Sequence, residues 1–180
     1  MEMTGEQLIP AAQAEVWRGL NDPEVLKACI SGCESIEKVT DVEYAVVTTA
    51  AIGPVKAKFR GKLLLADLDP PNSYSLSFDG QGGAAGFGKG TAKVSLAGDG
   101  DGTRLSYAVK AQVGGKLAQI GSRLIDGVAK KMADDFFSAF NAKIAGPAAA
   151  GREAEAAPGA APLWWVLAII AAMFLLAYFA

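Results

Sequence analysis

The residues that most often carry catalysis are few in this chain. Cys29 and Cys33 are its only cysteines, and its 180 residues include no histidine. His-based acid–base catalysis, Ser-His-Asp and Cys-His nucleophiles, and His-ligated metal or haem sites are therefore excluded. Two thiols are too few for a zinc site, and their C-x-x-x-C spacing differs from the C-x-x-C of redox pairs. We expect both cysteines to be reduced and structural.

A glycine-rich stretch imitates a nucleotide-binding loop. Residues 83–89 read GAAGFGK, the opening of a P-loop. Gly90 stands where Ser or Thr would bind magnesium, and residues 91–97 alternate like a strand. A P-loop requires a helix N-terminus beneath the phosphates. We expect residues 82–90 to form a mobile or bulged stretch whose small side chains leave room inside the fold.

The acidic residues show no catalytic grouping. Glu34, Glu37, Asp67, Asp79 and Asp126 are scattered along the chain, so we expect them on the solvated surface. Lys and Arg also occur singly, and the net charge is −2, which argues against a nucleic-acid partner. The sequence indicates no catalytic residue and no metal site.

The elements that must position any site follow from periodicity. Residues 2–9 predict a strand, residues 11–20 a helix, and Asp22 followed by Pro23 a helix start. Short alternating runs separated by turns then predict an antiparallel meander. We expect its strands at residues 34–39, 43–52, 56–63, 73–81, 91–97 and 105–113.

A long amphipathic helix is predicted over residues 116–144, where apolar side chains recur every three or four positions. At 1.5 Å per residue it is about 43 Å long, enough to lie across the sheet. The sequence therefore predicts an α+β helix-grip fold, a seven-stranded antiparallel sheet wrapped on a long helix. Inward glycines and alanines make the middle hard to fill, so we expect an apolar ligand cavity.

The candidate cavity residues are the apolar side chains expected to face the space between sheet and helix. Those on the strands are Phe59, Leu63, Leu76, Phe78, Phe87, Leu105, Tyr107 and Val109. Those on the helix are Leu117, Ile120, Leu124 and Val128.

The C-terminal segment is predicted to enter a membrane. Residues 163–180 read LWWVLAIIAAMFLLAYFA, without a charged residue, and as a helix they extend about 27 Å, close to the hydrocarbon thickness of a bilayer. Aromatic side chains lie near both ends, as is common at membrane interfaces. The predicted anchor residues are Leu163, Trp164, Trp165, Ile169, Ile170, Phe174, Leu175, Leu176 and Tyr178.

Three parts are thus expected: a domain at 1–145, a flexible Ala/Pro/Gly linker at 146–162 and a transmembrane tail anchor at 163–180. The N-terminus carries neither a basic leader nor a signal-length apolar run. We therefore expect the chain at the cytoplasmic membrane, with its domain facing the cytoplasm.

Four sequence motifs resemble those of one known family. They are NDPEVLKACISGCESIEK at 21–38, GPVKAKFRGK at 53–62, DPPNSYSLSFDGQGGAAGFGKG at 69–90, and AQVGGKLAQIGSRLIDGVAKKMADDFF at 111–137. Together they resemble the CoxG family of carbon monoxide dehydrogenase subunits, which belongs to the SRPBCC, or START-like, superfamily. Ser31 departs from the proline usual in relatives, which alters a turn rather than any chemistry.

The resemblance implies a helix-grip fold with a deep apolar cavity and no catalytic residue. It also implies an accessory role: attaching a molybdenum carbon monoxide dehydrogenase or related hydroxylase to the cytoplasmic membrane, and carrying a respiratory quinone. The expected ligand is menaquinone, ubiquinone or a similar isoprenoid lipid, bound without a covalent cofactor.

Two alternatives stay open at this point. One is a ligand-free assembly or maturation factor for the dehydrogenase. The other is a cyclase-type enzyme on the same fold, which the mostly apolar inward positions disfavour because cyclases usually place His, Arg or Asp in the cavity.

Overall fold

A computed structural model gives the structure of residues 1–153, with side-chain surroundings for residues 1–145. None of the helices within residues 1–153 is long and apolar enough to cross a membrane. The predicted anchor at 163–180, and the linker beyond residue 153, lie outside the described residues.

The described chain folds in the predicted order of strand, two helices, six strands and a helical segment. The elements are β1 (Glu2–Ile9), α1 (Gln13–Leu20), α2 (Pro23–Cys29), β2 (Cys33–Lys38), β3 (Glu43–Ile52), β4 (Val55–Asp69), β5 (Ser73–Gln81), the 3-10 turn η1 (Gly83–Ala85), β6 (Phe87–Asp99), β7 (Gly102–Gly114), α3 (Lys116–Gln119) and α4 (Ser122–Glu153).

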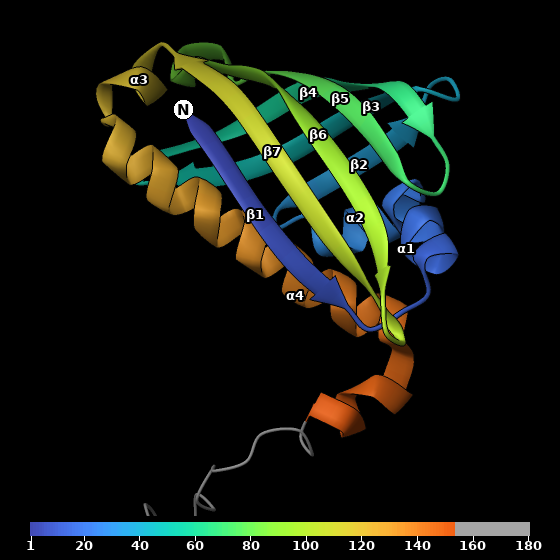
Figure 1. Cartoon of the computed structure of the whole chain (residues 1–180). Helices are drawn as coiled ribbons and strands as arrows, with labels where there is room; N and C mark the ends of the chain where they lie inside the picture. Colours follow the sequence, from blue (N-terminus) through green and yellow to red (C-terminus); the bar gives the residue numbers. More distant parts are fainter. Residues whose placement is uncertain (154–180) are drawn as a thin grey trace, which may run out of the picture.

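The strands form one seven-stranded sheet in the order β1-β7-β6-β5-β4-β3-β2. Every neighbouring pair is antiparallel, and β1 closes the meander by pairing with β7. The sheet bends around α4, while α1 and α2 lie together at one end (Figure 1). This confirms the helix-grip prediction for the described residues.

Local sequence signals explain several element boundaries. The Asp22 side chain accepts a hydrogen bond from the Glu24 backbone N–H at 2.9 Å, and Pro23 occupies the first helical position, where its missing N–H costs nothing. At the β6–β7 hairpin, Gly100 has φ +59°, a left-handed conformation that glycine adopts without a steric penalty. Short polar and glycine residues thus set the start of α2 and the final hairpin.

The prediction of one helix over residues 116–144 was wrong. Gly121 has φ +95°, which no helical residue adopts, and it separates the short α3 from α4. The helix also continues past Ile144 to Glu153. The backbone break changes the direction of the chain, so side chains before Gly121 do not extend the face of α4.

The glycine-rich stretch also differs from its prediction. Residues 83–85 form η1, and β6 begins at Phe87 instead of residue 91. Strand β4 is longer than predicted as well, because it continues through Leu64 and Leu65 to Asp69. Three consecutive leucines, Leu63 to Leu65, had hidden the alternation from the sequence pattern.

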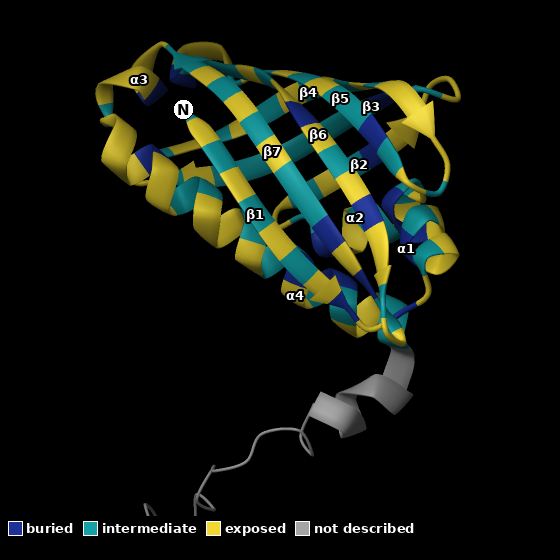
Figure 2. Cartoon of the chain, viewed as in Figure 1, coloured by how far each residue is buried: buried dark blue, intermediate teal, exposed yellow. Residues whose placement is uncertain are grey.

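The core lies where α1, β7 and the second half of α4 meet. Its most deeply buried side chains include Ile9, Val16, Leu105 and Phe140, each 0–1% exposed. Along the strands, more buried and exposed residues alternate, as expected for a sheet with one covered and one solvated face (Figure 2). This alternation assigns each strand residue to the face under α4 or to the opposite face.

Candidate functional site

An apolar cavity lies between the sheet and α4. The pairing register of the strands determines which side chains form its floor. Residues paired across antiparallel strands point to the same face. One register row joins Leu65, Leu76, Ala92, Val109 and Met3 across five strands. All of these residues line the cavity. We call this space the inner cavity.

A second register row completes the floor. It joins Tyr74 of β5, Val94 of β6 and Tyr107 of β7. Opposite them, Ala133, Phe136 and Phe137 of α4 form the roof. The inner cavity has a volume of about 260 Å³, and its full lining is Met3, Leu20, Leu26, Ile30, Tyr44, Leu63, Leu65, Tyr74, Leu76, Ala92, Val94, Leu105, Tyr107, Val109, Ala133, Phe136 and Phe137.

Aromatic contacts connect the walls of the inner cavity. The Tyr107 and Phe137 rings stack at 5.6 Å between centroids, which joins β7 to α4. Trp17 of α1 meets Tyr74 edge-on at 5.5 Å. Such pairs add about 0.5–1.5 kcal/mol each beyond burial, so they hold helices and sheet in a fixed arrangement.

Tyrosine hydroxyl groups are the polar side-chain groups of this lining, which contains no charged residue. The Tyr44 hydroxyl donates to the Asn21 carbonyl oxygen at 3.1 Å. The Tyr107 hydroxyl lies against Gly5, which has no side chain to exclude it. Burial, and then the charge of Asp134, raise the pKa of Tyr107 above its usual value.

Tyr74 is the second most buried of these tyrosines, with 6% of its surface exposed against 2% for Tyr44. Burial raises its pKa far above the usual value, and the nearby Tyr44 adds to this. The Tyr74 phenol is therefore protonated throughout the physiological pH range, and it can donate a hydrogen bond.

The structure brings together one part of the predicted cavity set. Leu63, Leu76, Leu105, Tyr107 and Val109 all line the inner cavity. They share the face of the sheet beneath the middle of α4, where Ala133, Phe136 and Phe137 lie. The alternation of the strands was sufficient to find them.

The remaining predicted residues lie outside this lining. The Phe59 ring packs against Gly82 and the Phe87 ring against Gly114. Leu117 is buried in α3 with 3% exposure, Ile120 and Leu124 lie near Gly53 at the β3–β4 turn, and Val128 is partly buried on α4. Phe78 pairs with Leu63 on the inner face, but its ring lies against Gly90 and borders a different depression, described below. The break at Gly121 explains why α3 does not reach the inner cavity.

Several lining residues were missed by sequence reasoning. Tyr74 was recognisable, because it alternates with Leu76 on β5. Ala133, Phe136 and Phe137 lie on the predicted helix, but the sequence does not say which of its turns covers the sheet. Met3 of β1 joins the site only through pairing with Val109, across the whole length of the domain.

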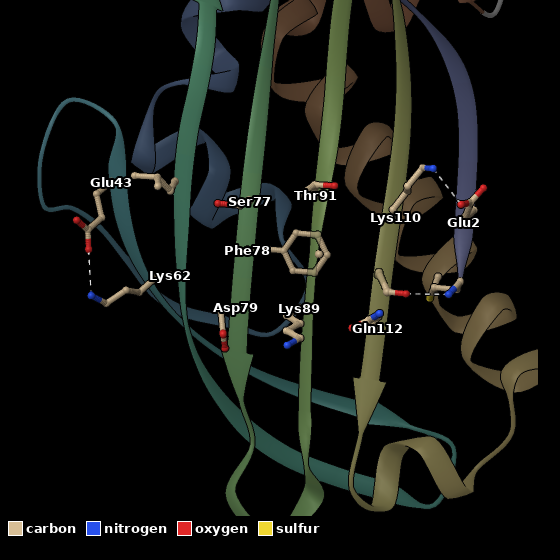
Figure 3. A pocket seen from close by; sticks show the side chains of 14 residues that line it. Glu2, Glu43, Lys62, Ser77, Phe78, Asp79, Lys89, Thr91, Lys110 and Gln112 are labelled. Carbon is tan, nitrogen blue, oxygen red and sulfur yellow. Dashed lines mark hydrogen bonds and ion pairs between the residues drawn. The ribbon is translucent and has the colours of Figure 1, made fainter.

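A larger depression lies on the opposite face of the sheet. It has a volume of about 860 Å³ and follows the register row Glu43, Leu64, Ser77, Thr91, Lys110 and Glu2. We call it the outer groove, and Figure 3 shows its side chains on the strands. Lys62 Nζ lies 3.2 Å from Glu43 Oε1, and Lys110 Nζ 3.2 Å from Glu2 Oε1.

Neither the cysteines nor the P-loop-like stretch forms a reactive site. Cys29 is 3% exposed, both thiols are free, and burial raises the pKa of each. Lys89 lies in β6, paired with Asp79, where no helix begins. Within residues 1–153 no group of His, Cys, Asp or Glu could hold a metal ion.

Comparisons with solved structures agree with this architecture. A conserved protein from Geobacillus kaustophilus is 35% identical, with a TM-score of 0.76 over 81% of this chain and 95% of that chain. A protein from Thermus thermophilus is 18% identical, with a TM-score of 0.60 over 80% of this chain and 97% of that one. The Zhui aromatase/cyclase from Streptomyces is 10% identical, with a TM-score of 0.60 over 80% and 93%.

The two more distant likenesses show the START-like (SRPBCC) fold alone. No curated protein sequence matches the chain. The family of the CoxG subunit of carbon monoxide dehydrogenase, in contrast, matches residues 5–145, which include every strand from β2 to β7 and every lining residue of the inner cavity except Met3. The chain therefore belongs to the CoxG family, a family of accessory subunits, and this membership associates it with carbon monoxide dehydrogenase.

Proposed function

We propose that this chain holds a molybdenum carbon monoxide dehydrogenase, or a related hydroxylase, at the cytoplasmic membrane and carries a respiratory quinone for it. The observation that carries the proposal is the inner cavity, an apolar space without charged side chains in a member of a dehydrogenase subunit family. Menaquinone, ubiquinone or a similar isoprenoid lipid is the proposed ligand.

The chemistry of the inner cavity supports binding rather than catalysis. Ligand sites are typically apolar with a few polar groups that orient the ligand, and the tyrosine hydroxyls fit that description. General acid–base chemistry at neutral pH would need a side chain whose pKa lies near 7. The pKa values of Tyr74 and Tyr107 are raised, which moves them further from 7. An apolar molecule gains by leaving water for such a space.

The volume of the inner cavity limits which part of a ligand it encloses. At about 260 Å³, it is slightly smaller than the roughly 300–1,000 Å³ of pockets that enclose a whole drug-sized ligand. A ring system fits this space, whereas a long isoprenoid chain does not. In our proposal the quinone ring occupies the inner cavity and the chain extends from it.

Residues 163–180 support the membrane half of the proposal. They contain no charged side chain, and their length as a helix would match a bilayer. An anchor there would keep the domain near the membrane, where quinones dissolve. Electrons from carbon monoxide oxidation would then pass to the carried quinone and on to the respiratory chain.

Anchoring is tested by removing residues 163–180 from the chain in cells that make the dehydrogenase. We expect dehydrogenase activity to move from the membrane fraction to the soluble fraction. A matched control replaces residues 163–180 by an unrelated apolar span of equal length, which should restore membrane association. Full membrane association of the dehydrogenase without any span would contradict anchoring.

Quinone delivery is tested with purified dehydrogenase, carbon monoxide and vesicles that contain menaquinone. Adding the full-length chain should increase the rate of menaquinone reduction. An unchanged rate, together with dehydrogenase that lacks its metal cofactor when made without the chain, would instead support the ligand-free maturation role.

A further inference from the structure

Tyr74 contributes to the lining of the inner cavity a hydroxyl group that has no hydrogen-bond partner within the described residues. Tyr74 lines the inner cavity and is 6% exposed, and within the described part of the chain no group forms a hydrogen bond with its hydroxyl. Tyrosine hydroxyls in largely apolar surroundings usually have a partner, and such a hydrogen bond contributes about 0.5–1.5 kcal/mol. A ligand in the inner cavity is the candidate for this partner.

The surroundings of Tyr74 restrict how this hydroxyl can act. The Trp17 and Tyr74 rings meet edge-on with 5.5 Å between their centroids, so a side chain of α1 fixes the position of the Tyr74 ring. The Tyr44 hydroxyl already donates to the Asn21 carbonyl oxygen. Of the two most buried tyrosines in the lining, only Tyr74 has its donor available to a ligand.

The chemistry of the partner follows from the lining. Burial raises the pKa of Tyr74, so its hydroxyl stays protonated and donates to an acceptor oxygen. An ionised acceptor would be costly to bury, because the lining offers no opposite charge. A neutral carbonyl oxygen on an apolar ring meets both conditions.

We propose that the Tyr74 hydroxyl donates a hydrogen bond to a ring carbonyl oxygen of an apolar ligand that enters the inner cavity ring first. The inference rests on the proposed function, since it assigns the orientation of the quinone in that cavity. Tyr74 thereby distinguishes quinones from hydrocarbons of the same shape.

The test uses the full-length chain in detergent and two probes of similar shape. Menadione has a naphthoquinone ring with two carbonyl groups, and 2-methylnaphthalene has the same ring system and methyl group without them. Tyr74→Phe should weaken menadione binding about three- to ten-fold, as expected for one hydrogen bond, and leave 2-methylnaphthalene binding unchanged. Thermal unfolding of both proteins checks that the variant folds.

A vibrational measurement reads the same hydrogen bond directly. The carbonyl stretch of bound, carbon-13-labelled menadione should lie at lower wavenumber in the native chain than in Tyr74→Phe. Equal weakening of both probes would show that the ring matters only for packing, and it would overturn the inference. Menadione binding and carbonyl frequency that are both unchanged in Tyr74→Phe would also overturn it while leaving the proposed function intact. If neither probe binds the native chain, the proposed function fails as well.

Discussion

The sheet separates the inner cavity from the outer groove. Successive residues of one strand point to opposite faces, so neighbours in the sequence line different spaces. On β6, Ala92 faces the inner cavity and Thr91 faces the outer groove. The outer groove is the larger, about 860 Å³ against about 260 Å³. Yet its lysine side chains are mostly exposed and two of them pair with carboxylates of the same face, whereas the inner cavity is apolar and tyrosine hydroxyls are the polar side-chain groups of its lining.

The difference teaches that the volume of a depression does not identify a binding site in this fold. A solvated face with paired charges offers little to a ligand, because water already satisfies those groups. A smaller apolar space releases water on binding and orients a ligand through one hydroxyl. Four experiments test whether the two faces differ as this account requires.

The largest expected effect concerns stability. Leu105→Ala removes a side chain that is 1% exposed beside the inner cavity, and it should lower the free energy of unfolding by about 2–5 kcal/mol. Leu64→Ala on the other face, where the side chain is 46% exposed, should cost about 1 kcal/mol or less. Urea unfolding measures both, and equal losses would contradict the assignment of the two faces.

The next effect concerns ligand affinity. Ala92→Phe places a ring in the inner cavity and should weaken menadione binding at least about ten-fold, or about 1.4 kcal/mol. Thr91→Phe, one residue away on the opposite face, should leave the affinity unchanged. Titration calorimetry compares them, and the reverse result would move the site to the outer groove.

A smaller effect is expected from the charges of the outer groove. The Lys62 side chain is 76% exposed and forms an ion pair with Glu43. Lys62→Met removes this pair and should change the free energy of unfolding by less than about 1 kcal/mol. The difference should vanish near 1 M salt, where the screening length is about 3 Å. A larger loss that persists at high salt would indicate a structured polar site there.

The smallest effect is a shift in one titration. Glu34 accepts from Lys58 and from the Thr49 hydroxyl, each at 2.7 Å, and these contacts lower the pKa of its carboxyl group. The stabilisation is present above the unfolded-state pKa, about 4.3, and is lost as the pH falls through the lower folded pKa. Lys58→Met should raise the Glu34 pKa in a carbon-13 NMR titration, and an unchanged midpoint would contradict the contact.

Much of the fold could be predicted because its signals are local. A β-branched run ended by Gly53-Pro54 located β3 to the residue, aligned apolar residues located β5, and the Asp22–Pro23 pair located the start of α2. The break at Gly121 could not be predicted, since a glycine in an apolar repeat is compatible with either a helix or a break.

The candidate site was predictable only in part, for a physical reason. Alternation identifies the face of the sheet that is covered, which gave Leu63, Leu76 and Val109. Which rows of that face form a cavity depends on where α4 crosses the sheet. That position is set by long-range contacts such as the stacking of Tyr107 on Phe137, which no local pattern encodes.

The central claim is that the inner cavity holds a quinone in cells. The most direct measurement is to purify the full-length chain and its Ala92→Phe and Thr91→Phe variants from membranes, extract each with organic solvent, and quantify quinones by mass spectrometry. Our account predicts co-purified quinone with the native chain and Thr91→Phe, and at least about ten-fold less with Ala92→Phe. Equal amounts in all three, or none with the native chain, would contradict it.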